Sequence, residues 1–109
     1  MNIAALEAML QSGKDNALLR FGLGKAYLDE GHASQAITHL LACTQHDPGY
    51  SAAWKLLGKA YLQSQDTAAA LNAWTEGLTA AQTKGDKQAE KEMTVLVRRI
   101  HKSADNQDG

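Results

Sequence analysis

Three of the four histidines recur every seven residues, at His32, His39 and His46, and the single cysteine, Cys43, lies among them. Imidazole nitrogen and thiolate sulfur are ligands of zinc sites, so this segment is the first candidate for chemistry. In a helix, seven residues span two turns, a rise of about 10–11 Å, which is too long for two ligands of one ion. Pairs that include Cys43 lie three or four residues apart, but buried cysteine usually behaves as a small hydrophobic residue. We therefore expect no metal and no cofactor, and we interpret the histidines as solvated surface groups.

The remaining polar residues give no pattern for catalysis. The sequence has no G-x-S-x-G motif, no Cys–His–Asp arrangement that helical faces would bring together, and no glycine-rich loop for phosphate. A run of mixed charge near the C-terminus contains Glu90, Lys91, Glu92, Arg98 and Arg99. Such a run is typical of a solvated helix face. We predict that the chain is not an enzyme.

The composition indicates one domain without a nucleic-acid or membrane partner. At 109 residues the chain is long enough for one hydrophobic core, and its net charge of −1 does not favour binding to nucleic acid or to an anionic membrane. One cysteine excludes an internal disulfide framework and suits a reducing compartment. The first residues, MNIAALEAML, lack the basic segment and long apolar run of a secretion signal, and no stretch approaches the roughly 20 apolar residues that span a bilayer. We expect a cytoplasmic protein.

Alanine and leucine abound and β-branched residues are sparse, which favours helices throughout. Glycine, proline and capping residues divide the chain into six segments, and the short connections require successive helices to pack as antiparallel neighbours. We predict helices over residues 2–13, 17–29, 33–46, 51–64, 66–85 and 86–102. The polar residues 103–109 are expected to form a disordered tail.

The hexapeptide LGKAYL occurs twice, at residues 23–28 and again at 57–62. Shifting residues 17–48 forward by 34 also places Leu40 on Trp74. Self-similarity at a fixed period is the mark of a repeat architecture, in which one small structural unit is stacked on the next. Because each period holds two predicted helices, the unit is a helix hairpin.

The repeated glycines, Gly24 and Gly58, fall in the middle of predicted helices. Glycine there costs about 1 kcal/mol relative to alanine. The repeat therefore implies, at both positions, a contact between helices that is too close for a Cβ atom. We expect Ala36 and Ala70 to be the close partners of these glycines.

The repeat resembles the tetratricopeptide repeat (TPR) family, whose 34-residue unit reads W-x₂-L-G-x₂-Y, followed by an alanine, a large apolar residue and a proline. The second unit carries the pattern at Trp54, Leu57, Gly58, Tyr61, Ala70 and Trp74. The first unit carries it at Leu23, Gly24, Tyr27, Ala36, Leu40 and Pro48. The first unit departs from the pattern at Arg20, which replaces the tryptophan, and the second at Gln82, which replaces the proline.

The resemblance implies a small bacterial-type TPR protein with an all-α fold, a right-handed α-solenoid of antiparallel helix hairpins with about six helices. Its domain would cover residues 1–102, with a half-repeat at 2–13, repeats at 17–48 and 51–82, and a capping helix at 86–102. The first helix resembles the second half of a missing unit, because Leu6 lies 34 residues before Leu40. Two units and two half-units give the three layers that a solenoid needs for stability. The resemblance also places Cys43 at a small buried position.

In the family, the first helix of each unit lines a concave groove that binds peptides. Carried over position by position, the resemblance gives the groove residues Leu18, Phe21, Lys25, Lys55, Leu56 and Lys59. Members that bind chaperones clamp a terminal carboxylate with lysine and asparagine side chains. Phe21 and Leu56 stand at two of those positions, so that clamp is not expected. Alternatively, Leu18 and Phe21 pack on the first helix, and the lysines serve solubility alone.

We therefore expect a non-catalytic protein–protein interaction module that binds a protein or peptide on its concave groove. The lysines favour an acidic partner segment with one or two apolar anchors, and the module itself is expected to be a monomer or a weak homo-oligomer. The alternative is a structural unit that forms a homo-oligomer through exposed helix faces. Met9 and Val95 are the apolar residues expected to lie outside the core on those faces.

Overall fold

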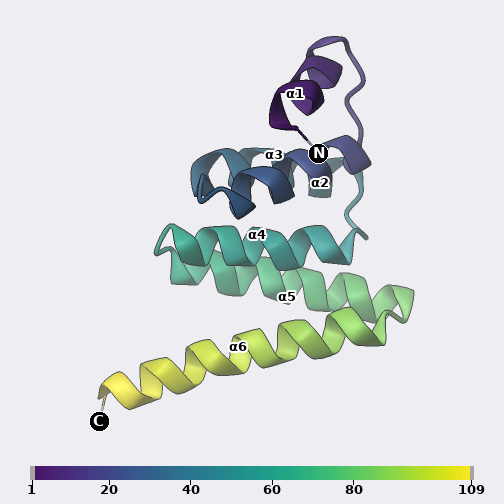
Figure 1. The fold of residues 1–109 in the computed structure, drawn as a ribbon. Helices are drawn as coiled ribbons and strands as arrows, with labels where there is room; N and C mark the ends of the chain where they lie inside the picture. The colour runs from purple at the N-terminus through teal and green to yellow at the C-terminus, as the bar shows by residue number, and fades with distance from the viewer. Residues whose placement is uncertain (1, 109) are drawn as a thin grey trace.

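The computed structural model describes residues 2–108, with side chains through residue 103. Within this range the chain forms six helices and no strand, in the order α1 (Ile3–Gln11), α2 (Ala17–Asp29), α3 (Ala33–His46), α4 (Ser51–Gln63), α5 (Thr67–Lys84) and α6 (Lys87–Asp108) (Figure 1). The predicted all-α architecture is confirmed. Across the described helices, none has both the length and the apolar character needed to cross a membrane.

Short polar residues fix where the helices begin. The side chains of Asn2, Asn16 and Asp66 each accept a hydrogen bond from a backbone N–H in the first turn of α1, α2 and α5. These bonds satisfy donors that a helix start leaves without a partner. At the end of α5, Gly85 adopts the left-handed conformation (φ 73°) that stops a helix and that glycine tolerates without strain.

The last helix continues past its expected end. We expected a capping helix over residues 86–102 and a tail without fixed structure, whereas α6 runs to Asp108. Neither glycine nor proline occurs from residue 102 to residue 108, so each added residue extends the helix by one more backbone hydrogen bond. Residues 1 and 109, which belong to the expected domain and tail, lie outside the described residues.

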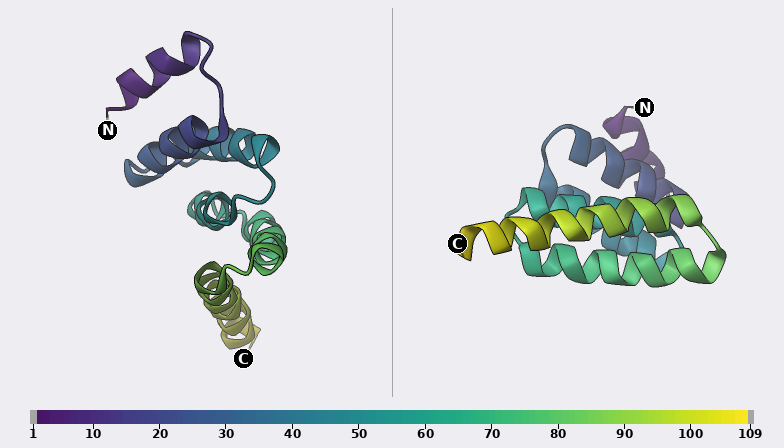
Figure 2. Two further views of the ribbon diagram at one scale, coloured as in Figure 1. Left: turned by 90° about the vertical axis from the view of Figure 1, so that its right-hand side faces the viewer. Right: turned by 90° about the horizontal axis from the view of Figure 1, so that it is seen from below.

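The helices stack as hairpins in successive layers. The most extensive contacts join α2 to α3 and α4 to α5, while α3 packs on α4, and α5 on α6. In the left view of Figure 2, α4 and α6 lie on one side of the stack and α5 on the other. The backbone of α1 lies close to that of α2 and to that of no other described helix. This is the arrangement of an α-solenoid of antiparallel helix hairpins, as predicted.

The core follows the repeat. The largest fully buried side chains include Leu23, Leu40, Leu57, Trp74 and Met93, which come from five successive helices. Leu40 and Leu57 belong to one apolar cluster and Trp74 and Met93 to the next, so each hairpin shares its core with the following helix. Removal of this much apolar surface from water is the main stabilising term of the fold.

The glycine contacts are as close as predicted, but their partners differ. A Cβ atom on Gly24 would lie 2.5 Å from Cγ of Leu40, and one on Gly58 would overlap the indole of Trp74. We expected Ala36 and Ala70 at these contacts, but the nearest atoms belong to Leu40 and Trp74, one helical turn further along. A helical side chain leans toward the N-terminus of its own helix, so the large residue one turn further along covers the glycine.

Candidate binding surface

One of the histidines that we expected at the surface is buried. His39 on α3 is 8% exposed, its ring stacks on Tyr27 with centroids 5.5 Å apart, and its Nδ1 atom lies 3.0 Å from a guanidinium nitrogen of Arg20. Arginine has no acceptor, so Nδ1 accepts this bond, and the proton of the neutral ring is on Nε2, 3.3 Å from Oε1 of Glu7. Burial lowers the pKa of His39; Glu7 opposes this effect, and the nearby guanidinium adds to it. The prediction of a solvated histidine therefore fails at His39, because partners from two other helices satisfy its ring.

Arg20 also links His39 to Asp15, which lies in the segment between α1 and α2. Arg20 donates two hydrogen bonds to Asp15, at 2.8 and 3.0 Å, and Nε2 of His46 lies 3.0 Å from the same carboxylate. The bond from Arg20 is the main reason why the pKa of Asp15 falls to about 2. Arg20 stands where the second repeat has Trp54. The departure from the repeat thus builds a polar network, together with Glu7, that ties α1 to α2 and α3.

Cys43 has the character of a core residue. Its side chain is fully buried, and this burial, with a smaller contribution from Asp47, raises the pKa of the thiol to about 11. A thiol with so high a pKa is a poor nucleophile and a poor metal ligand at neutral pH. Among the residues that the structure describes, no group of three or more His, Cys, Asp or Glu side chains is placed to hold a metal ion.

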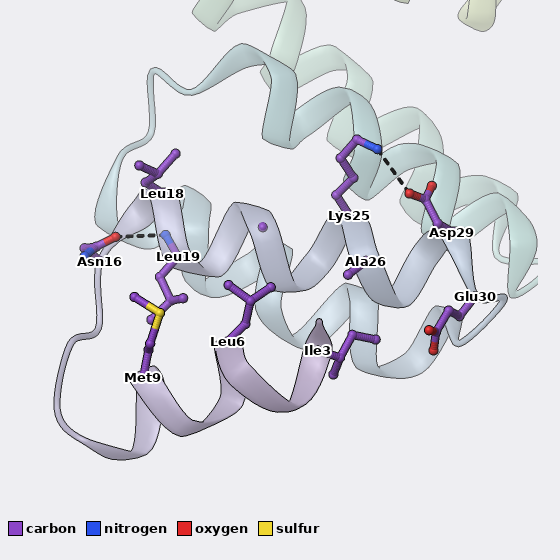
Figure 3. Close-up of a pocket in the computed structure, with 11 residues that line it drawn as sticks. Ile3, Leu6, Met9, Asn16, Leu18, Leu19, Lys25, Ala26, Asp29 and Glu30 are labelled. Atoms are coloured by element: carbon purple, nitrogen blue, oxygen red, sulfur yellow. Dashed lines mark hydrogen bonds and ion pairs between the residues drawn. The ribbon is translucent and has the colours of Figure 1, made fainter. Parts of the chain in front are cut away.

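A groove runs between α1 and α2. Its volume is about 620 Å³, and its lining is formed by Ile3, Leu6, Met9, Asn16, Leu18, Leu19, Gly22, Lys25, Ala26, Asp29 and Glu30. Figure 3 shows Ile3, Leu6 and Met9 pointing from α1 toward α2, with Leu18 at one end of the groove and Glu30 at the other. The two helices therefore supply the two walls of the groove.

The groove leaves apolar side chains in contact with solvent. Leu18 is 73% exposed and Met9 41% exposed, whereas Leu6 and Leu19 are buried between the helices. The wall is open because α1 has no second helix paired with it, unlike α3 and α5, which each lie between two helices. Two exposed large apolar residues beside one groove are typical of a surface that binds a partner.

The predicted lysine row is interrupted by ion pairs. Lys25 lies 3.1 Å from Asp29, one helical turn away, and Lys55 lies 2.5 Å from Glu92 of α6. The bond from Lys55, followed by one from Gln88, lowers the pKa of Glu92. Two of the three lysines therefore already have carboxylate partners.

A second, smaller groove contains the other two predicted lysines, Lys55 and Lys59. It has a volume of about 280 Å³, lies between α4 and α6, and is lined by Lys55, Lys59, Lys91, Glu92, Val95, Leu96 and Arg99. We expected Glu92 and Arg99 on a solvated helix face. Arg99 is exposed, as expected, although it lines this groove, whereas Glu92 is half-buried and paired with Lys55 of α4. A local excess of cations remains here after the Lys55–Glu92 pair is formed.

Two of the predicted groove residues, Phe21 and Leu56, are partly engaged in packing within the fold. The ring of Phe21 stacks on Tyr50 with centroids 4.9 Å apart, and Leu56 packs against the central core cluster. Of the six predicted groove residues, the structure thus places Leu18 and Lys25 in the α1–α2 groove and Lys55 and Lys59 in the α4–α6 groove. The wall formed by α1 was missed, although the match of Leu6 to Leu40 was a signal for it.

Three comparisons with known proteins agree with this architecture. A family model described as tetratricopeptide repeat matches residues 28–84, more than half of the chain. The chain is 58% identical over 103 residues to TPR repeat-containing protein PA0015 of Pseudomonas aeruginosa, covering 94% of this chain and 98% of that protein. It is also similar to the solution structure of protein BPP2914 from Bordetella parapertussis, with a TM-score of 0.83, 47% identity, and coverage of 94% of this chain and 90% of that one. The repeat, the helix stack and these matches agree, and the chain belongs to the tetratricopeptide repeat family.

Proposed function

We propose that the chain is a non-catalytic interaction module that binds a partner protein through its two grooves. The observation that supports this most strongly is the uncovered apolar wall of the α1–α2 groove, where Leu18 is 73% exposed. TPR domains in general act in protein–protein interaction. An exposed leucine beside a groove of this size is the type of anchor site that partner side chains fill.

The α4–α6 groove supplies the electrostatic part of the proposal. Lys59, Lys91 and Arg99 line it, and a partner segment with acidic residues would meet them there. Exposed charges of this kind contribute more to the rate and specificity of association than to affinity. Binding should therefore weaken with added salt, because charges separated by more than about 8 Å are screened at physiological ionic strength.

The absence of enzymatic activity is part of the proposal. Glu92, which lines the α4–α6 groove and has a lowered pKa, is paired with Lys55. Three other titratable groups with shifted pKa values are engaged in structural contacts: Asp15 with Arg20, His39 with Glu7, and Cys43 within the core. None of these three residues lines the α1–α2 groove or the α4–α6 groove. A cytoplasmic location stays a prediction.

The test is capture of partners from a lysate of the source organism, with mass spectrometry of the bound proteins. Immobilised wild type would be compared with Leu18→Glu and Lys59→Glu, and with Leu41→Glu as the matched control. Leu41 is also an exposed leucine (37%), but it lies on α3, outside both grooves. We expect a partner that wild type and the control retain and that the groove variants lose. Equal capture by all four proteins would refute binding through the grooves.

Self-association is the second candidate. Met9 is 41% exposed and Val95 39% exposed, so both lie outside the core as expected. Light scattering over a concentration series distinguishes the two candidates. A constant monomer mass favours the partner-binding module, and a mass that rises with concentration favours the homo-oligomer.

A further inference from the structure

The repeat shows what normally covers a surface of the kind found in the α1–α2 groove. Helix α2 begins at residue 17 and α4 at residue 51, so a shift of 34 maps the pair α1 and α2 onto α3 and α4. Under this shift Met9 corresponds to Cys43, and Ala26 to Ala60. Cys43 and Ala60 are completely buried, whereas Met9 is 41% exposed and Ala26 is partly exposed. The groove is therefore a repeat contact from which one element is missing.

The missing element is a helix. On the equivalent surface, Gly24 of α2 lies against Leu40, and Phe21 of α2 stacks on Tyr50. In Figure 1 the helices α2, α4 and α6 run in the same direction across the stack, so a preceding helix would lie parallel to α2. An extended peptide fits less well, because two helices offer no free backbone partners for its N–H and C=O groups. A helix satisfies those groups internally.

We infer that the α1–α2 groove binds an amphipathic helix of a partner protein, in the position that the first helix of a preceding repeat would take. This inference rests on the proposed function. The bound helix carries a glycine or alanine opposite Leu6, as Gly24 lies opposite Leu40, and large apolar side chains that contact Met9 and Leu18. Its last turn carries lysine or arginine, because Asp29 and Glu30 line that end of the groove, where Lys25, paired with Asp29, is the single lysine or arginine among the lining residues. Basic residues also suit the C-terminal end of a helix dipole.

A second copy of this chain fits the groove poorly. A second copy would offer α6, the helix at the free end of its stack. To take the place of the missing helix beside α1, α6 would need a residue small enough for a close contact between helices, as glycine is in α2 and α4. Helix α6 begins 36 residues after α4, so Thr94 stands where Gly58 makes the close contact in α4. The residues of α6 from position 101 onward, HKSADNQD, include no large apolar side chain that could contact Met9 and Leu18. The partner is therefore a different protein.

The inference is tested with a probe taken from this chain. The probe is a fluorescein-labelled peptide of residues 16–31, NALLRFGLGKAYLDEG, with Asp29→Lys and Glu30→Lys and with a side-chain staple on its solvent face. The staple is needed because isolated helices this short are marginal in water. One control peptide carries Gly24→Leu in addition, and a second retains Asp29 and Glu30. Circular dichroism confirms that the three peptides are equally helical.

Fluorescence anisotropy then measures binding to the whole protein. We expect saturable binding of the probe, with an affinity reduced about tenfold by Leu18→Glu in the protein and by Gly24→Leu in the peptide. The first change removes an apolar contact, and the second inserts a large side chain where the helix must approach Leu6 closely. Met9→Glu is expected to act like Leu18→Glu, whereas Leu41→Glu should leave the affinity within about twofold. The peptide that retains the two acidic residues should bind more weakly than the probe at low salt. Leu18 and Met9 are exposed, so we expect these variants to fold, and their melting curves check this.

Three results would overturn the inference. They are no saturable binding of the probe, equal binding of the Gly24→Leu peptide, and dimerisation of the protein that Leu18→Glu abolishes. If the probe peptide does not bind while capture of a natural partner still depends on Leu18, the inference that the groove binds a helix is wrong, but the proposed function stands. If capture is also insensitive to Leu18 and Lys59, the proposed function fails with it.

Discussion

Two glycines of one helix should respond in opposite ways to the same substitution. Gly22 and Gly24 both lie within α2, so alanine gains the same helix propensity at each, about 1 kcal/mol. At Gly22 the new Cβ would lie 3.9 Å from the nearest side-chain atom, on Leu6, which is an ordinary contact. At Gly24 it would lie 2.5 Å from Cγ of Leu40 and 2.6 Å from Cδ2 of the same residue, and Leu40 is completely buried.

The free-energy difference follows from the packing. Overfilling a tight core contact costs about 1–3 kcal/mol, because the neighbouring side chain is forced off its rotamer or the helices move apart. Gly22→Ala should therefore stabilise the fold by about 0.5–1 kcal/mol, while Gly24→Ala should be less stable than Gly22→Ala by about 1–3 kcal/mol. Because the two variants share the propensity term, their difference isolates the contact between α2 and α3.

Urea unfolding followed by circular dichroism measures this difference. With a denaturant slope of about 1–3 kcal/mol per M, the two midpoints should be separated by about 1 M. The slopes should agree, since neither change alters the surface that unfolding exposes. If Gly24→Ala is as stable as Gly22→Ala, the close packing of α2 on Leu40 is wrong.

Three further outcomes are expected. Gly58→Ala should destabilise more than Gly24→Ala in the same urea assay, because its Cβ would displace the rigid, fully buried indole of Trp74, whose Nε1 donates a 3.0 Å hydrogen bond to a backbone oxygen. The pKa of His39 is held below its ordinary value of 6.5, so its contribution to stability is complete above about pH 6.5 and is lost as the pH falls toward the folded-state pKa. His39→Gln should therefore flatten the fall in the urea midpoint between about pH 7 and pH 5. An unchanged pH profile of the midpoint would contradict this. The Cys43 thiol, with a pKa raised to about 11 and no exposed surface, should react with N-ethylmaleimide at pH 7.5 only as fast as the protein opens, so rapid labelling of the native protein would contradict its burial.

The sequence predicted the hairpins well because the repeat states the same information twice. The two LGKAYL segments fix the period, and in both units the glycine makes the predicted close contact. What the spacing did not specify was the contacting atom. Ala36 and Leu40 lie one helical turn apart on α3, and the direction in which side chains lean along the helix decides which of the two lies nearest to Gly24.

The polar network was hidden because its members come from separate segments. Glu7, Arg20 and His39 lie on three different helices, and the spacing of residues within one helix does not indicate which side chains of two other helices will contact it. The Lys55–Glu92 pair was missed for a related reason. Helix α6 begins 36 residues after α4, not 34, so its register could not be obtained by extending the repeat.

The wall of the α1–α2 groove that α2 forms was predicted, and the wall that α1 forms was not. Leu18 and Lys25 were placed on a binding surface because they occupy family positions on the first helix of a unit. The opposite wall depends on how α1 packs, and a half-repeat carries too few pattern residues to specify that packing. The exposure of Met9 indicates the missing helix beside α1, because Cys43 at the equivalent position of the repeat is fully buried.

The most direct test of partner binding through the grooves is an amide chemical-shift map of the ¹⁵N-labelled chain with a captured partner. The account predicts that the largest changes fall in α1 and α2, around Met9, Leu18 and Gly22, with a second set around Lys59. Changes confined to α3 and α5, around the exposed Leu41, with α1 and α2 unaffected, would contradict it.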